Sequence, residues 1–109
     1  MKRLVLAAVL MGAAVLSAQP PTIGEFFDRF TTEWVRENPN QAVNARFFSG
    51  AEQQALDRQL TPQTDEWARR RRELARRGLA ELARYDFSRL NTMDRRSGEL
   101  MRWQLQIRL

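Results

Sequence analysis

The side chains that could carry out chemistry in this chain are carboxylates, hydroxyls and arginines, because its 109 residues include neither histidine nor cysteine. These absences exclude the commonest general base, a thiolate nucleophile and the usual zinc ligands. Metal binding would depend on carboxylates alone, and the best-spaced pairs are Glu33 with Glu37 and Glu52 with Asp57. Neither pair lies in a calcium loop or a Glu-x-x-His motif. We interpret both pairs as parts of solvated helix faces.

The hydroxyl groups lack the partners that a serine nucleophile requires. None of the serines has a histidine to act as its base, and none lies in a Gly-x-Ser-x-Gly motif: Ser17, Ser49, Ser88 and Ser97. No glycine-rich phosphate loop is present either. The sequence therefore predicts no catalytic, cofactor-binding or metal-ligating residue in this chain, and no enzyme activity for this segment.

Arg71 is the one charged residue that interrupts an apolar helix face, one turn after Trp67. We predict that its stem lies over the Trp67 indole, a cation–π contact worth about 0.5–1 kcal/mol when exposed. Anion binding by Arg71 is the alternative interpretation. Gly78 lies on the same face at a cost of about 1 kcal/mol relative to alanine, which predicts the close approach of another helix there.

These residues belong to the most strongly helical segment of the chain, which we expect to form a helix over residues 62–85. Thr61 is suited to be its N-cap and Pro62 its first residue. At 100° per residue, one apolar face contains Trp67, Leu74, Gly78, Leu82 and Tyr85. Most of the arginines between residues 69 and 84 lie opposite this face. We predict i,i+4 ion pairs of Asp65 with Arg69, Glu66 with Arg70 and Glu73 with Arg77.

Three further segments have helical signals. Thr22 and Glu25 form a capping box that begins a helix over residues 23–38, and Ser49 and Glu52 form another that begins a helix over residues 50–60. The first of these helices has a strongly aromatic face: Ile23, Phe26, Phe27, Phe30 and Trp34. Between the two helices, Asn38 is suited to cap a short helical turn over residues 39–44.

The last segment, residues 92–109, is ambiguous because its apolar residues alternate from Met101 onward, as in a strand. We predict a helix capped by Asn91, since no partner strand is evident elsewhere. Trp103 and Ile107 then require more protein to cover them. The expected fold class is all-α, with about four helices in an incomplete bundle, as in an N-terminal fragment of a larger helical protein whose C-terminal region packs against this one.

Residues 1–18 have the form of a cleaved secretory signal peptide. Lys2 and Arg3 precede an apolar run over residues 4–16, and small residues follow it. A membrane anchor is the alternative, but about 13 apolar residues would span only about 20 Å of a hydrocarbon core about 30 Å thick. Residues 19–22 would form a linker. We therefore expect an exported protein, periplasmic or secreted, with no stable membrane span after cleavage.

The charge of the chain gives little support to nucleic-acid binding. The net charge of +5 includes Lys2 and Arg3, and without them 16 basic residues stand against 13 acidic ones. Lys2 is the only lysine, whereas nucleic-acid surfaces usually combine lysine, arginine and exposed aromatic residues. We expect no nucleic-acid partner.

The order and spacing of several short motifs resemble the N-terminal region of the bacterial family called domain of unknown function 885. These motifs are Phe26-Phe27-Asp28-Arg29-Phe30 with Trp34, Glu37-Asn38-Pro39 with Ala42, Leu74-Ala75, Leu79 to Leu82, Leu90-Asn91-Thr92-Met93-Asp94-Arg95, and Arg102-Trp103-Gln104-Leu105. The family is mostly helical, commonly exported and similar to thermolysin-like zinc metallopeptidases. The resemblance implies a helical scaffold or cap that precedes a zinc-binding region, with no cofactor in this segment, because the family's His-Glu motif has no counterpart here.

Two other interpretations stay open. A small periplasmic helical binding protein, similar to the Spy-type chaperones, would also be exported, basic and all-helical. Leu60-Thr61-Pro62 resembles their Leu-Thr-x-x-Gln signature, but Thr64 lies where glutamine should be. A lone anion or nucleic-acid binder would use the arginines from Arg69 to Arg77.

Overall fold

A computed structural model of the chain describes residues 19–109, and the predicted signal peptide, residues 1–18, lies outside the described residues. Within residues 19–109 the secondary structure is entirely helical, which confirms the all-α class. The elements are α1 (Ile23–Arg36), α2 (Pro39–Ala45), α3 (Gly50–Asp57), α4 (Asp65–Leu82), a 3₁₀ turn η1 (Phe87–Arg89) and α5 (Thr92–Gln106). None of the helices in this part of the chain has the length and apolar content needed to cross a lipid bilayer.

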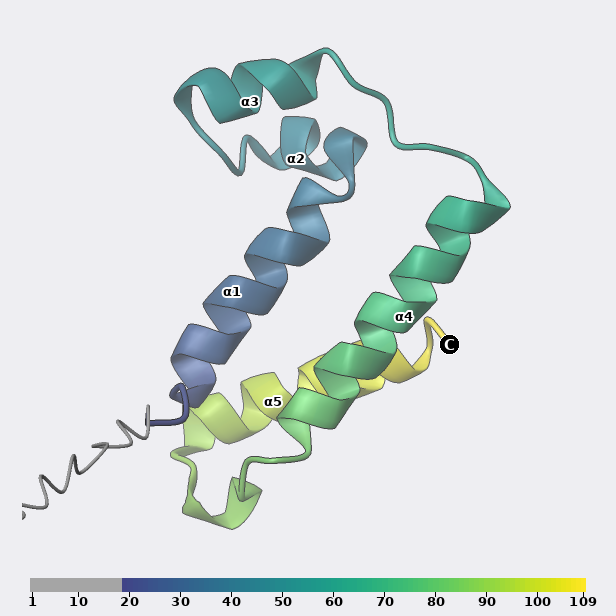
Figure 1. Cartoon of the computed structure of the whole chain (residues 1–109). Coiled ribbons are helices and arrows are strands. Elements are labelled where there is room, and N and C mark those ends of the chain that lie inside the picture. The colour runs from purple at the N-terminus through teal and green to yellow at the C-terminus, as the bar shows by residue number, and fades with distance from the viewer. Residues whose placement is uncertain (1–18) are drawn as a thin grey trace, which may run out of the picture.

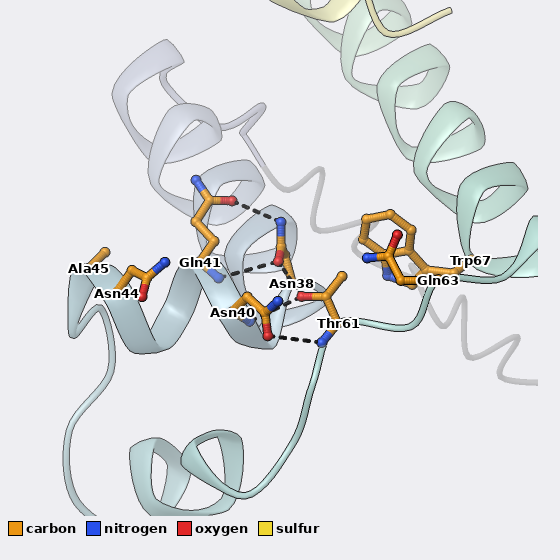
Figure 2. A pocket seen from close by; sticks show the side chains of 8 residues that line it. All are labelled: Asn38, Asn40, Gln41, Asn44, Ala45, Thr61, Gln63 and Trp67. Carbon is orange, nitrogen blue, oxygen red and sulfur yellow. Dashed lines mark hydrogen bonds between the residues drawn. The ribbon is translucent and has the colours of Figure 1, made fainter.

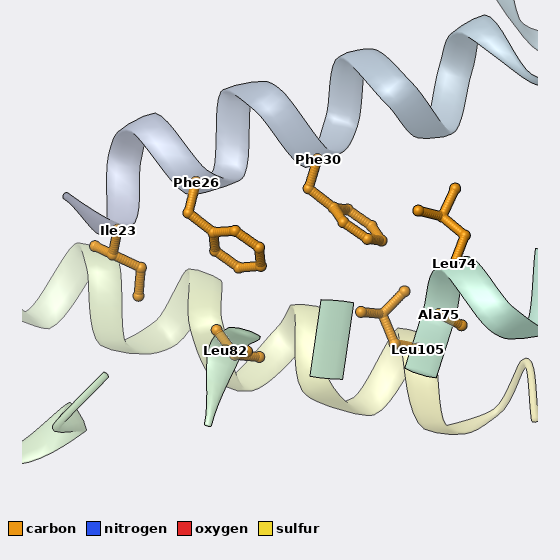
Figure 3. Packing of buried hydrophobic residues seen from close by; sticks show 7 residues of the cluster. All are labelled: Ile23, Phe26, Phe30, Leu74, Ala75, Leu82 and Leu105. Atoms are coloured by element: carbon orange, nitrogen blue, oxygen red, sulfur yellow. The ribbon is translucent and has the colours of Figure 1, made fainter. Parts of the chain in front are cut away.

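Helices α1 and α4 lie side by side, and α5 begins beside the N-terminal end of α1 and runs across α4 (Figure 1). Their shared interior, which we call the aromatic core, consists of Ile23, Phe26, Phe30, Leu74, Ala75, Leu82 and Leu105. Figure 3 shows Phe26 and Phe30 pointing from α1 toward α4 and α5. The Phe30 ring also stacks on the Trp34 ring, with centroids 5.8 Å apart. The aromatic stripe predicted for the first helix is therefore the main source of the core.

Helices α2 and α3 pack on each other at the far end of α1 (Figure 1). A second, smaller cluster holds them there, and we call α2, α3 and this cluster the α2–α3 lobe. Its buried apolar residues are Val35, Ala42 and Leu56, with Phe48 packed against them.

Gly78 lies where α4 meets the other two core helices, as its position on the apolar face predicted. A methyl group at Gly78 would lie 2.5 Å from Cε2 of Phe30 and 2.9 Å from Cδ1 of Leu105. Both distances are far shorter than van der Waals contact, so any side chain at position 78 would force Phe30 and Leu105 to move where α1, α4 and α5 converge.

The principal helix is shorter than expected, and Thr61 is not its cap. Thr64 takes that role, because its side chain accepts a hydrogen bond from the Trp67 N–H at 3.1 Å. Thr61 instead bonds to α2, with its N–H donating to Asn40 Oδ1 at 3.1 Å. A residue held by α2 cannot also cap α4, and the helix therefore begins at Asp65 and ends at Leu82.

The other predicted caps had mixed outcomes. Thr22 accepts from the Glu25 N–H at 3.2 Å and Asn91 accepts from the Asp94 N–H at 2.8 Å, which confirms the caps of α1 and α5. Ser49 is the N-cap residue of α3, as predicted, but the capping box was wrong, because the Ser49 side chain makes no capping bond. The carboxylate of Glu52 pairs with Arg36 on α1 at 2.7 Å. Helix α5 is a helix, not a strand, as far as Gln106.

Candidate functional site

Arg71 is buried at the junction of α1 and α4, with 8% of its surface exposed. Its guanidinium carbon lies 3.5 Å from the ring centroid of Trp34 and 5.3 Å from that of Trp67. The predicted cation–π contact therefore exists, but its closer partner is the indole of Trp34 on α1. The sequence could not show this, since Trp34 is 37 residues away.

The same guanidinium also caps the C-terminal end of α1. Its Nη1 donates to the main-chain oxygen of Trp34 at 2.6 Å, while Trp67 Nε1 donates to the Glu37 oxygen at 2.9 Å. Carbonyls in the last turn of a helix lack intrahelical partners and carry partial negative charge. Two side chains from the first turns of α4 thus cap α1, and this accounts for Arg71 without a bound anion.

The pKa of Arg71 is lowered to about 10, chiefly by burial; the nearby Glu37 opposes the change and Arg108 adds to it. The group is still charged at neutral pH. Among the described residues it has no carboxylate within ion-pair distance. A buried cation without an ion-pair partner raises the electrostatic potential around Trp34, although Glu37 and the Trp34 carbonyl offset part of it.

A groove of about 570 Å³ with a mixed lining runs between α1 and α5, next to Trp34, and its polar lining residues are Thr31, Gln41, Ser97, Gln104 and Arg108. The α1 wall includes Phe27, Phe30 and Trp34, and the α5 wall includes Leu100, Met101, Trp103, Leu105 and Ile107. Leu100, Trp103 and Ile107 are 54%, 58% and 62% exposed. Arg108 is the only charged residue that lines the groove. Contiguous apolar surface of this kind marks an interaction site more often than single exposed side chains do. Trp103 and Ile107 were predicted from the sequence to need covering protein, whereas Leu100 and the opposing wall from α1 were not.

A second, polar pocket of about 620 Å³ lies where α2 meets the segment that leads into α4 (Figure 2). Asn38 Oδ1 accepts from the Thr61 hydroxyl at 2.6 Å, and the Thr61 hydroxyl in turn accepts from the Asn40 N–H at 3.1 Å. The Asn38 side chain also caps α2 by accepting from the Gln41 N–H at 3.3 Å, as predicted. These bonds fasten the connection to α2, so the polar groups are largely used by the fold itself.

The acidic and hydroxyl residues considered as candidates do not converge. Glu33 pairs with Arg77 at 3.0 Å, Glu52 with Arg36, and Ser88 donates to Asp86 at 2.6 Å. Ser97 lies at the edge of the groove, and Ser17 lies outside the described residues. In residues 19–109 no group of three or more acidic side chains could hold a metal ion. The residues of this chain do not fit the zinc site of the resembled family.

The arginine-rich face of α4 is partly neutralised, but not by the expected pairs. Arg69 bonds to Glu66 at 2.6 Å and to Glu73 at 2.7 Å, and Arg77 reaches across to Glu33 on α1. The predicted i,i+4 pairs were wrong, because Arg69 lies between two glutamates on its own helix and Arg77 meets a third on the neighbouring one.

Comparison of the chain with protein-family models, with curated proteins and with solved structures finds no match. The features that point to a function are therefore the groove between α1 and α5 and the two arginines near one end of it, Arg71 and Arg108.

Proposed function

We propose that this chain is an exported helical scaffold that forms the N-terminal cap of a larger helical protein, as the resemblance to the domain of unknown function 885 family implies. The observation that carries the proposal is the groove between α1 and α5, whose α5 wall leaves Leu100, Trp103 and Ile107 more than half exposed. Burying one such side chain is worth about 1.5–3 kcal/mol. A covering body of protein would gain that energy.

The residues that carry the resemblance support a structural role. Phe26, Phe30, Leu74, Ala75, Leu82 and Leu105 all belong to the aromatic core. Asn91 caps α5, and Trp34 supports Arg71. Many residues of these motifs are therefore packing or capping residues, while Met93 and Trp103 are exposed. On this proposal catalysis and zinc belong to a region beyond this segment, and the segment itself has no catalytic, cofactor-binding or metal-ligating residue.

Export is proposed from residues 1–18, with periplasmic or secreted as the destination. The charged start and the apolar run before Ser17 and Ala18 support it. We also propose that the chain has no nucleic-acid partner, because Arg69 and Arg77 are engaged by glutamates and Arg71 is buried.

The coding DNA downstream of codon 109 tests the scaffold proposal. A reading frame that continues and encodes a His-Glu helix motif with a further downstream glutamate would support it. A stop codon directly after Leu109 would contradict it.

The same groove favours a second candidate, a small periplasmic helical binding protein of the chaperone type. Its apolar walls would accept segments of unfolded proteins. This candidate predicts that the purified chain slows the aggregation of a denatured test protein and that Ile107→Asp removes the effect, whereas a scaffold would leave aggregation unchanged.

A further inference from the structure

The two ends of the groove differ, because a charged residue lines only one of them, and this difference restricts what can bind there. Its lining combines apolar side chains with the uncharged polar residues Thr31, Gln41, Ser97 and Gln104, and its one charged lining residue, Arg108, lies near Arg71 and Trp34. Arg108 forms no ion pair with any described residue. By contrast Arg29, Arg36, Arg69, Arg77 and Arg89 all pair with carboxylates. Other arginines, Arg76 among them, also form no ion pair with a described residue, but Arg108 is the one that lines the groove, so the charge of the groove lining is positive and lies at one end.

The dimensions of the groove suit a helix. The lining residues of the α5 wall run from Ser97 to Arg108, which is about 17 Å at 1.5 Å per residue and matches about three turns of a partner helix. Two helical walls that present rows of apolar side chains commonly receive the apolar face of an amphipathic helix.

Charge argues against a second copy of this chain as the occupant. The stretch from Thr92 to Arg108 contains four arginines, Arg95, Arg96, Arg102 and Arg108, against two acids, Asp94 and Glu99. A symmetric pair of α5 helices would set this basic segment against itself. Like charges across an interface oppose association, whereas opposite charges favour it.

We propose that the groove between α1 and α5 receives an acidic amphipathic helix, whose apolar stripe packs on Trp103 and Ile107 and whose carboxylates meet Arg108 at the end nearest Arg71. This inference rests on the proposed scaffold function and specifies the chemistry of the covering body. The partner helix completes a four-helix arrangement with α1, α4 and α5.

Two synthetic helical peptides of about three to four turns test the proposal. Both carry the same leucine stripe; one has glutamates and the other lysines beside it. The fluorescence anisotropy of each labelled peptide is measured against the full-length chain at low salt. We expect the glutamate peptide to bind at least fivefold more tightly, and Arg108→Glu to reverse this preference. Ile107→Asp should weaken the binding of both peptides at least tenfold, because it places a charge in the apolar contact. The Ile107 side chain is exposed, so the substitution should leave the fold intact, which circular dichroism checks.

Arg76→Glu is the matched control, because Arg76 is exposed and has no ion-pair partner among the described residues. It makes the same change of net charge outside the groove. The proposal is overturned if Arg76→Glu alters peptide selectivity as much as Arg108→Glu does. It is also overturned if the two peptides bind equally, or if sedimentation equilibrium shows a dimer that Ile107→Asp dissociates. None of these results bears on the downstream reading frame, so failure of this proposal is distinguishable from failure of the scaffold function.

Discussion

The aromatic core and the α2–α3 lobe are both helical and both touch α1, but different forces hold them. The aromatic core buries seven residues from three helices, including two phenylalanines. The lobe buries only Val35, Ala42 and Leu56. It adds the Thr61 hydrogen bonds and the Arg36–Glu52 ion pair. Exposed ion pairs contribute at most about 1 kcal/mol. The lobe should therefore open locally while the core remains folded.

The largest expected effect comes from breaking the aromatic core at Phe26. Its side chain is fully buried and packs on Phe30 and Tyr85, with ring centroids 6.0 Å and 5.8 Å away. Phe26→Ala should lower the free energy of unfolding by about 3–5 kcal/mol, measured by urea denaturation with circular dichroism. Phe47→Ala, at a 42% exposed ring, is the control and should cost far less. Equal costs would remove the distinction between core and periphery.

Breaking the lobe should have a smaller and more local effect. Leu56 is its largest buried aliphatic residue, and Leu56→Ala should cost about 2–3 kcal/mol. Hydrogen exchange followed by mass spectrometry should show faster exchange in α2 and α3 and unchanged protection in α4 and α5. If protection fell equally in all the helices, the lobe and the core would form one cooperative unit.

The Thr61 bonds provide a sharper test of the lobe. Thr61→Val keeps the shape of the side chain but removes the hydroxyl that joins Asn38 and Asn40. Asn38, which is half-buried, and Asn40, which is exposed, then each lose a hydrogen bond, at a cost of about 0.5–1.5 kcal/mol per bond. The local exchange pattern should match that of Leu56→Ala. Thr64→Val, which removes the α4 cap instead, should leave α2 and α3 protected.

A pair of alanine substitutions compares two glycines that sit against rings. At Gly78 a new Cβ meets the buried Phe30 and Leu105, whereas at Gly98 it would lie 2.8 Å from Cζ of Phe87, a half-buried ring that can move. Overpacking a core costs about 1–3 kcal/mol, whereas replacing glycine by alanine within a helix stabilises the helix by about 1 kcal/mol. Gly78→Ala should therefore destabilise by about 1–2 kcal/mol in thermal unfolding, and Gly98→Ala by less. The reverse order would show that α4 can shift.

Much of the fold was predictable because its signals are local. Neighbouring residues predicted the apolar faces of α1 and α4 and the caps Thr22 and Asn91. They also predicted a close helix approach at Gly78, but not that Phe30 and Leu105 would make it. The absence of histidine and cysteine was equally plain from composition. The groove was predictable only in part, since the uncovered α5 residues are visible in sequence but the α1 wall is not.

By itself the sequence determined that this part of the chain is helical and which faces of α1 and α4 are apolar, because both properties depend on the identity and spacing of neighbouring residues. Only the tertiary structure decided the partners. Thr61 forms hydrogen bonds with Asn38 and Asn40 at the start of α2. The Arg71 guanidinium lies over the Trp34 ring, and Arg77 forms an ion pair with Glu33. A polar side chain bonds to the acceptor or aromatic ring that lies nearest to it in space. Which distant segments lie close together depends on how the apolar faces pack.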